Sequence, residues 1–339
     1  MEARGAARSE AKLGLNSEPE SEDLRAGGSG WLGGAANYAL VCKLAKRLLG
    51  SGRIRRNYTV ARTYYALLYG SRSLLGASPL VIYQMGKVGS STLWRSLAPF
   101  DLGRPAFRVH SLTPEHLEDG LGGVGMSARE YYEQRSTHDL VGRYLRRELE
   151  RARGRDRWKV ITLVRDPLAQ NVSSFFQLLD LRAPELLERH RSGTLQMQDL
   201  LARYLEDYPP DCIFNRWFEA EMGAVFGLDV FADPFPWDQG YRIYQAADAD
   251  VLVLRLEDMD RCGGEVMREF LGLEGFRVIP DNVGDDKGYA DLYRDFQARA
   301  QLPVEYVDAV YGSRLVQHFY SPAEVESFAA RWQRPGSGA

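Results

Sequence analysis

Four short apolar runs, each followed by a segment with helical spacing, constrain the fold of this chain more than any other feature. The runs are "PLVIYQM" (79–85), "AFRVHSL" (106–112), "WKVITLVRDP" (158–167) and "DVLVLRLEDM" (250–259). Runs of this length, rich in β-branched and aromatic residues, indicate buried strands. Their alternation with helices indicates a mainly parallel sheet that helices cover on both faces. The sequence therefore predicts an α/β fold, a three-layer α/β/α sandwich.

The two ends of the chain differ in amino-acid composition from this region. Residues 1–30 contain no aromatic residue and are rich in Gly, Ser, Glu and Arg, which predicts a disordered tail. Residues 31–78 include "NYALVCKLAKRLLG", which predicts a basic, amphipathic helical extension. Such helices either pack on their own domain or rest on an anionic membrane. We expect the α/β domain to cover residues 79–330 and a second disordered tail to cover 331–339.

Composition and charge exclude several classes of protein. The net charge of −3 argues against broad nucleic-acid binding, although a local pocket for a small anion is compatible with it. The three cysteines, Cys42, Cys212 and Cys262, are far apart and predict reduced thiols and no metal site. Residues 1–30 lack the apolar segment of a signal peptide, and the apolar stretch from Trp31 is too short to span a bilayer. We therefore expect a cytoplasmic protein, with peripheral membrane contact as an open alternative.

The stretch "VIYQMGKVGSSTLWRSL" (81–97) predicts a strand, a turn of small polar residues and a helix. Such a turn places successive backbone N–H groups around an anion at the positive end of the helix. Gly89 permits a positive φ, the hydroxyls of residues 90–92 are donors, and Lys87 adds a cation. Lys87 precedes Gly89, unlike the G-x-x-x-x-G-K-[ST] order of nucleoside-triphosphate loops. The alternative is a purely structural role, in which the turn only caps a helix.

A second polar element follows the third predicted strand. Arg165 stands at the carboxyl end of that strand, the edge at which open α/β sheets bind ligands. Its rigid donor fork suits a phosphate, and the hydroxyl of Ser173, eight residues later, could reach the same group. The alternative is a structural ion pair between Arg165 and Asp166 or another acid.

Together these two elements resemble the family of sulfotransferases that use 3′-phosphoadenosine 5′-phosphosulfate (PAPS). The resemblance implies a P-loop sandwich and PAPS as co-substrate. We expect no metal, because no run of carboxylates is placed to hold magnesium beside the loop. The resemblance assigns the 5′-phosphosulfate to Lys87, Val88, Gly89, Ser90, Ser91 and Thr92. It assigns the 3′-phosphate to Arg165 and Ser173, and a closing loop over the nucleotide to "DNVGDDKGYADLYRDF", with Lys287 and Gly288.

A finer resemblance is to the sulfotransferase-like group of capsular polysaccharide synthesis proteins. It rests on "YQMGKVGSSTL", "RDPLAQNVSSFF" and "FNRWFEAEMGAVFGLDVF", and spans about residues 79–320. This resemblance implies a glycan acceptor and a role in polysaccharide or capsule biosynthesis.

Transfer to a hydroxyl needs a general base. His110, at the end of the second strand, lies on the same sheet edge as Lys87 and Arg165 if the strands are parallel, and carbohydrate 2-O-sulfotransferases are similar in placing a His there. Glu115 and His116 are the reserves, and a structural role for His110 stays open. Lys87 is expected to neutralise or protonate the leaving group in a metal-independent, in-line reaction.

Three aromatic residues of the segment after residue 215 allow two interpretations. Trp217, Trp237 and Tyr241 form either a sugar-binding platform or, more commonly for such spacing, part of the core. Two other functions also remain open for the whole chain. One is a P-loop enzyme of the nucleotide-kinase kind, and the other is a non-catalytic nucleotide-binding protein of glycan assembly.

Overall fold

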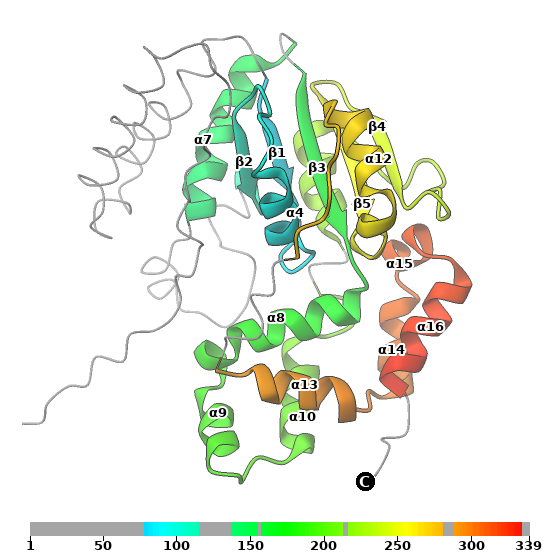
Figure 1. The fold of residues 1–339 in the computed structure, drawn as a ribbon. Helices are drawn as coiled ribbons and strands as arrows, with labels where there is room; N and C mark the ends of the chain where they lie inside the picture. Colours follow the sequence, from blue (N-terminus) through cyan, green and yellow to red (C-terminus); the bar gives the residue numbers. More distant parts are fainter. Residues whose placement is uncertain (1–77, 115–136, 155–156, 213–215, 281–287, 334–339) are drawn as a thin grey trace, which may run out of the picture.

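The computed structural model describes residues 78–114, 137–154, 157–212, 216–280 and 288–333, and these contain a five-stranded sheet in the order β2-β1-β3-β5-β4 (Figure 1). The strands β1 (Leu80–Tyr83), β2 (Ala106–Val109), β3 (Trp158–Val164) and β5 (Ala249–Arg255) are parallel. β4 (Tyr241–Gln245) pairs with β5 in the antiparallel sense at one edge. The predicted sandwich with a mainly parallel sheet is confirmed.

The four predicted strands all form, and among the strands of the described ranges β4 is the one that the sequence did not indicate. β1 is buried at every residue, and β3 and β5 at all but one, which is why they read as continuous apolar runs. β4, with the sequence "YRIYQ", lies at an edge and buries only Tyr241 and Tyr244, which are three positions apart. A half-exposed strand of five residues leaves no continuous apolar signal.

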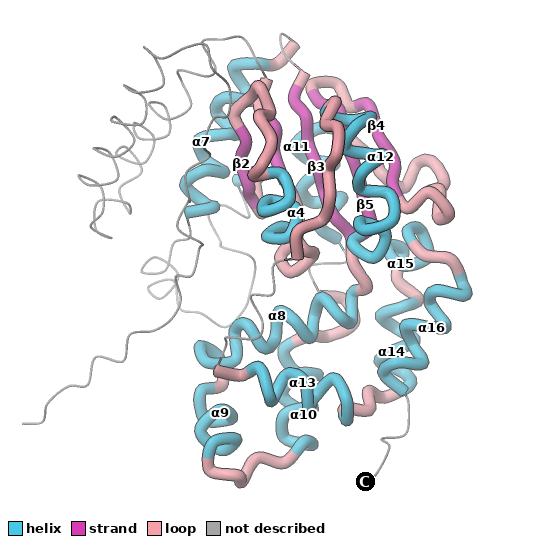
Figure 2. The backbone as a smooth tube through the Cα atoms, in the orientation of Figure 1, coloured by secondary structure: helices cyan, strands magenta, loops and turns pink. Residues whose placement is uncertain are grey.

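Helices cover both faces of the sheet, as Figure 2 shows. α4 (Ser90–Leu97) and α12 (Met259–Leu271) lie on one face, where Lys159 of β3 stacks over Phe270 of α12. α7 (Thr137–Ala152), the π-helical turn η2 (Phe218–Gly223) and α11 (Ala224–Phe226) lie on the other face. There Phe107 of β2 contacts Tyr144 of α7, and Tyr83 of β1 contacts Trp217. Both apolar faces of the central strands are therefore removed from water.

A helical lobe lies beyond the carboxyl ends of the parallel strands, and β3 runs directly into it (Figure 1). It consists of α8 (Pro167–Arg182), α9 (Pro184–Arg191), α10 (Met197–Asp207) and α13 (Ala290–Arg299). Its core is aromatic: Phe175 and Phe176 of α8 pack against each other and against Phe296 of α13. The lobe therefore has its own packing centre opposite the edge at which the strands end.

The C-terminal helices are α14 (Val304–Tyr311), α15 (Arg314–Phe319) and α16 (Pro322–Gln333), and a buried cation at the end of β5 bonds residues of α15 and α16. Arg255 donates to the carbonyl of Phe319 at 3.1 Å, to that of Trp237 at 2.9 Å and to the Glu324 carboxylate at 3.0 Å. α16 continues past residue 330, where we expected the tail to begin, and Trp332 is buried there. The domain thus reaches Gln333, because the indole side chain belongs to the core.

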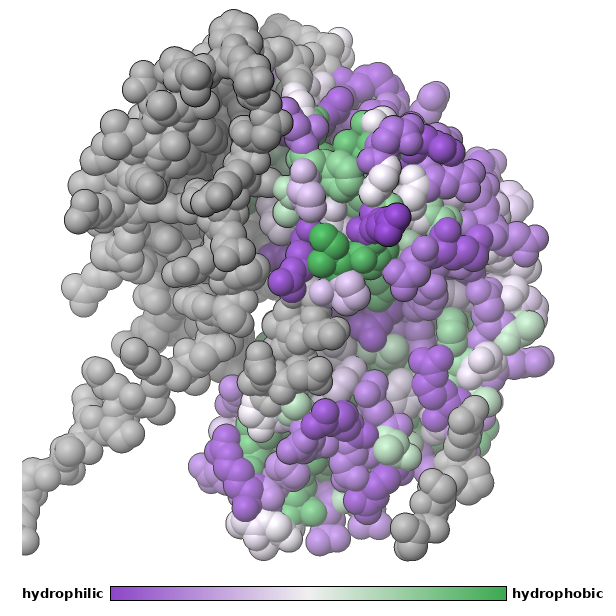
Figure 3. Space-filling view, viewed as in Figure 1, coloured by the Kyte–Doolittle hydropathy of each residue, from purple (hydrophilic) through white to green (hydrophobic). Residues whose placement is uncertain are grey.

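The coloured part of the surface in Figure 3, which belongs to the described residues, is mainly hydrophilic. Trp237, Ile279 and Val304 are the exposed large hydrophobic residues of the described part of the chain. Within that part, no helix combines the length and the apolar character that crossing a membrane would need.

Candidate functional site

The strand order creates a switch point between β1 and β3. From β1 the chain continues to β2 on one flank, whereas β3 leads to β5 on the other. Open α/β sheets bind ligands outside the carboxyl ends of the strands at such a point. The Lys87 turn follows β1 and Arg165 follows β3, so both predicted elements lie beside the switch point.

The turn after β1 has the backbone conformation that an anion-binding loop requires. Lys87 has a φ of 65°, the only positive φ of a non-glycine residue in the described ranges, and Gly89 has a φ of 93°. Gly89 is also the N-cap of α4 and makes no side-chain capping bond. Left-handed residues turn successive N–H groups toward one side, and such strained backbone is concentrated at functional sites. The predicted strand, turn and helix are all present.

Gly89 also lies too close to its neighbour for any side chain. A Cβ atom on Gly89 would lie 2.4 Å from Cδ1 of Leu256. Leu256 begins the 3₁₀ turn η3 (Leu256–Asp258), which follows β5. The phosphate-loop candidate is therefore packed directly against the end of a second parallel strand.

The segment after β3 supports the backbone of the same turn. Arg165 donates from Nη1 to the carbonyl oxygen of Lys87 at 3.0 Å. Gln170 of α8, which is buried, donates from Nε2 to the carbonyl oxygen of Gly86 at 2.8 Å. The side chain of Asp166 caps α8 instead of pairing with Arg165, accepting from the Leu168 amide at 3.0 Å. The structure thus places the Arg165 guanidinium on the backbone of the Lys87 turn, and its role as a 3′-phosphate ligand stays a prediction.

A further cation at this edge was not recognised in the sequence. Arg108 of β2 donates from Nη1 to the hydroxyl oxygen of Ser91, the second residue of α4, at 3.1 Å. The signal available was a charged residue inside an otherwise apolar strand. Of the other predicted nucleotide contacts, Ser173 is half-buried on α8 and Gly288 is exposed, while Lys287 lies outside the described residues. Their roles stay predictions.

His110 directly follows β2 and is half-buried. Its Nδ1 lies 2.9 Å from the carbonyl oxygen of Gln84, which can only accept a hydrogen bond. Nδ1 must therefore carry the proton, and Nε2 is the basic nitrogen of the neutral ring. This is the tautomer that a general base at Nε2 requires. The reserve candidates Glu115 and His116 lie outside the described residues.

Two carboxylates, Asp166 after β3 and Glu257 after β5, lie at the carboxyl ends of these neighbouring strands. Asp166 is buried and accepts from the Tyr311 hydroxyl at 2.9 Å, while its own amide donates to Glu257 at 2.8 Å. Glu257 also accepts from the Tyr320 hydroxyl at 3.1 Å. Burial raises the pKa of the Asp166 carboxyl. Glu257 is exposed as a whole residue, but protein atoms surround its carboxyl group. The resulting desolvation raises the pKa of that carboxyl as well.

Asp166→Asn is expected to make the protein progressively more stable than wild type as pH rises. The folded-state pKa of Asp166 lies above its ordinary value of 3.8. Folding therefore binds a proton in the window between these two values, and wild-type stability falls as pH rises through it. Asparagine carries no charge and is an equally good N-cap. Urea unfolding of both proteins at a series of pH values tests this; a stability difference that does not change with pH would contradict it.

The aromatic segment belongs mainly to the core. Trp217 and Tyr241 are buried, so they cannot form a sugar platform. The interpretation as core residues is correct for both. Trp237 is 38% exposed and donates its indole N–H to the carbonyl of His318 at 2.9 Å.

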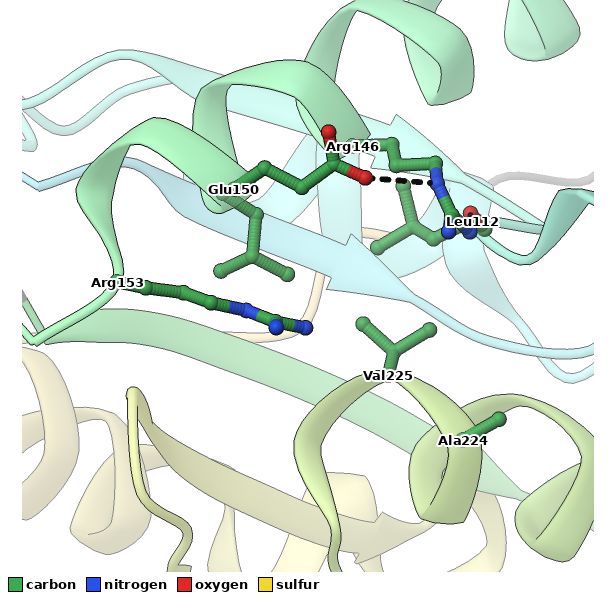
Figure 4. Close-up of a pocket in the computed structure, with 7 residues that line it drawn as sticks. Leu112, Arg146, Glu150, Arg153, Ala224 and Val225 are labelled. Carbon is green, nitrogen blue, oxygen red and sulfur yellow. Dashed lines mark hydrogen bonds and ion pairs between the residues drawn. The ribbon is translucent and has the colours of Figure 1, made fainter.

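A shallow hollow lies between α7 and α11, on the face opposite α4 (Figure 4). Arg146 points from α7 toward Leu112 and donates to its carbonyl oxygen at 3.1 Å. Arg153 extends toward Val225 across the hollow. The hollow borders the back of the loop that carries His110, and it does not open onto the Lys87 turn.

Residues 211–321 match the model of a protein family named NKWYS, which is described as "Putative capsular polysaccharide synthesis protein". A search of curated proteins and a search of solved structures found no match. The matched segment contains η2, β4, β5 and the helices α12 to α15. It supports the resemblance to capsular polysaccharide synthesis proteins over this part of the chain. It does not include the Lys87 turn or Arg165, so the resemblance to sulfotransferases stays a prediction.

Proposed function

We propose that the protein is a sulfotransferase that moves a sulfuryl group from PAPS to a hydroxyl of a glycan acceptor. The observation that carries the proposal is the left-handed turn at Lys87 and Gly89, located at the switch point with the Arg165 guanidinium on its backbone. The family match over residues 211–321 supports the polysaccharide class of the acceptor.

The cations at this edge suit a nucleotide that carries two anionic groups, a 5′-phosphosulfate and a 3′-phosphate. The amides of the turn and of the first turn of α4 would hold the 5′-phosphosulfate, together with Lys87 and the hydroxyls of residues 90–92. Arg108, on the hydroxyl of Ser91, adds positive charge to the same group. Arg165 and Ser173 would hold the 3′-phosphate. Gly288, and Lys287 outside the described residues, stay predicted nucleotide contacts.

The reaction then follows from the positions of His110 and Lys87. The acceptor oxygen attacks sulfur in line with the bond to the 5′-phosphate, and His110 Nε2 takes the hydroxyl proton. The carbonyl of Gln84 stabilises the resulting imidazolium through Nδ1–H. As the bond between sulfur and the phosphate oxygen breaks, Lys87 and the turn amides neutralise the charge on the leaving oxygen. The products are the sulfate ester, 3′-phosphoadenosine 5′-phosphate (PAP) and a proton.

Calorimetric titration with PAP and with ADP, each with and without magnesium, tests the donor site. PAP is expected to bind without metal and at least about tenfold more tightly than ADP, because the Arg165 site recognises the 3′-phosphate. Equal or magnesium-dependent binding of ADP would contradict the proposal and favour the kinase-like alternative. Tight PAP binding without transfer of labelled sulfate to any glycan in a broad acceptor screen would favour the non-catalytic alternative.

A further inference from the structure

A fully buried carboxylate lies behind the loop that carries His110. Glu221 of η2 accepts at Oε2 from the amides of Leu112 at 2.9 Å and Thr113 at 3.2 Å. Its Oε1 accepts from the Thr113 hydroxyl at 2.7 Å, and its Oε2 also accepts from the Tyr83 hydroxyl. One side chain thus joins β1, the loop after β2 and the π-helical turn.

Trp217 reaches the same loop from one turn earlier. Its indole N–H donates to the carbonyl oxygen of His110 at 3.1 Å, and its ring packs edge-on against Tyr83. The two residues are four positions apart, so they face the same side of their helix. π-Helical turns are rare in proteins, and those that occur are often at functional sites. Together the two side chains hold the backbone at both ends of residues 110–113.

An apolar residue would fill the place of Glu221 at lower cost if packing were its only role, because a buried carboxylate must be desolvated. The hydrogen bonds described for Glu221 instead go to Tyr83 and to two consecutive residues of one loop. Glu221 bonds the backbone amides of Leu112 and Thr113 and the Thr113 hydroxyl, and Trp217 bonds the backbone carbonyl of His110. These contacts act on His110 through the loop backbone, whereas Nδ1 of its ring bonds the Gln84 carbonyl.

We infer that Trp217 and Glu221 are positioning residues that place His110 for deprotonation of the acceptor. The inference rests on the proposed function, in which His110 is the base. Both residues lie within the segment that matches the polysaccharide-synthesis family. This assigns part of that segment to the acceptor side of the site, separate from the nucleotide side formed by the Lys87 turn and Arg165.

Four variants separate hydrogen bonding from packing. Glu221→Leu keeps most of the volume but removes every acceptor. Glu221→Gln retains an amide oxygen that can take the place of Oε2, so it serves as the conservative rescue. Trp217→Phe keeps an aromatic ring and removes the N–H donor. Glu219→Leu is the matched control, because Glu219 is exposed on the same helical turn.

Hydrogen exchange at the amides of Leu112 and Thr113 is the first measurement. Glu221→Leu is expected to accelerate it about tenfold or more, and Glu221→Gln much less. The second is NMR titration of the histidine rings, with the His110 signal, one of five, assigned through His110→Asn. We expect Glu221→Leu and Trp217→Phe to shift or broaden that signal and to lower kcat for sulfate transfer. The affinity for PAP should stay unchanged.

Exchange rates and a His110 signal equal to those of Glu219→Leu would overturn the inference. So would an unchanged kcat in a variant with a disturbed His110 signal. If the wild-type protein fails to bind PAP, the proposed function fails, whereas the exchange and NMR data still report whether the loop is held. If Glu221→Leu does not fold, Trp217→Phe and Thr113→Val, which each remove one bond to the loop, provide the same test.

Discussion

Replacement of Gly89 by alanine is expected to abolish nucleotide binding and to lower the free energy of unfolding by about 2–5 kcal/mol. Two independent causes contribute. The φ of 93° is unfavourable for any residue with a Cβ atom, and that Cβ would lie 2.4 Å from Cδ1 of Leu256. The Leu256 side chain or the turn must shift to relieve this overlap, and the backbone strain at position 89 moves the turn amides out of the arrangement in which they converge on an anion. Urea unfolding and calorimetric titration with PAP measure the two effects.

The matched control is Gly86→Ala in the same turn. Gly86 has no positive φ, and a Cβ there would meet no atom within 4 Å. Its unfolding free energy should stay within about 1 kcal/mol of wild type. Adding Leu256→Ala to Gly89→Ala should relieve the overlap but not the backbone strain, and so should restore stability only in part. Indistinguishable behaviour of Gly89→Ala and Gly86→Ala would show that the turn does not need glycine at position 89.

The strands and the turn that the sequence predicts are each determined by the residues of one short segment. β1, β3 and β5 are recognisable because burial on both faces makes them uniformly apolar. The turn after β1 is recognisable from its small polar residues, although the positive φ of Lys87 is not, since Lys rarely adopts it. The edge strand β2 still alternates between partly buried and buried residues, whereas β4 shows neither that alternation nor a continuous apolar run, and so it was not recognised.

The missed residues of the site are those that depend on contacts between distant segments. Glu221 and Tyr83 are separated by 138 positions, and Glu257 and Asp166 by 91. Nothing in the local sequence distinguishes Glu221 from the exposed Glu219 two residues earlier. Only the register of the sheet and the placement of η2 against the loop after β2 bring these groups together. Pattern analysis thus locates the turn and Arg165, whereas the fold identifies what holds His110.

Arg165→Ala is expected to weaken PAP binding about 100-fold or more, because a bidentate guanidinium–phosphate pair supplies two charge-assisted hydrogen bonds. Arg165→Lys keeps the charge but loses the planar donor fork, so its affinity for PAP should lie between those of wild type and Arg165→Ala. Arg157→Ala is the control: it removes an exposed arginine before β3, at the opposite end of the strand, where it pairs with Asp250. Calorimetry with PAP measures all three, and a loss in Arg157→Ala equal to that in Arg165→Ala would point to a general charge effect.

The same variant separates the two roles that the structure allows for Arg165. Its Nη1 supports the Lys87 carbonyl, so the substitution could weaken binding by loosening the turn instead of by removing a phosphate ligand. Adenosine 5′-phosphate, which lacks the 3′-phosphate, distinguishes these causes, since it depends on the turn alone. If Arg165 binds the 3′-phosphate, Arg165→Ala removes most of the preference for PAP over adenosine 5′-phosphate and affects the latter little. If Arg165 only supports the turn, both ligands lose affinity by the same factor, the preference survives, and the assignment of the 3′-phosphate to Arg165 is wrong.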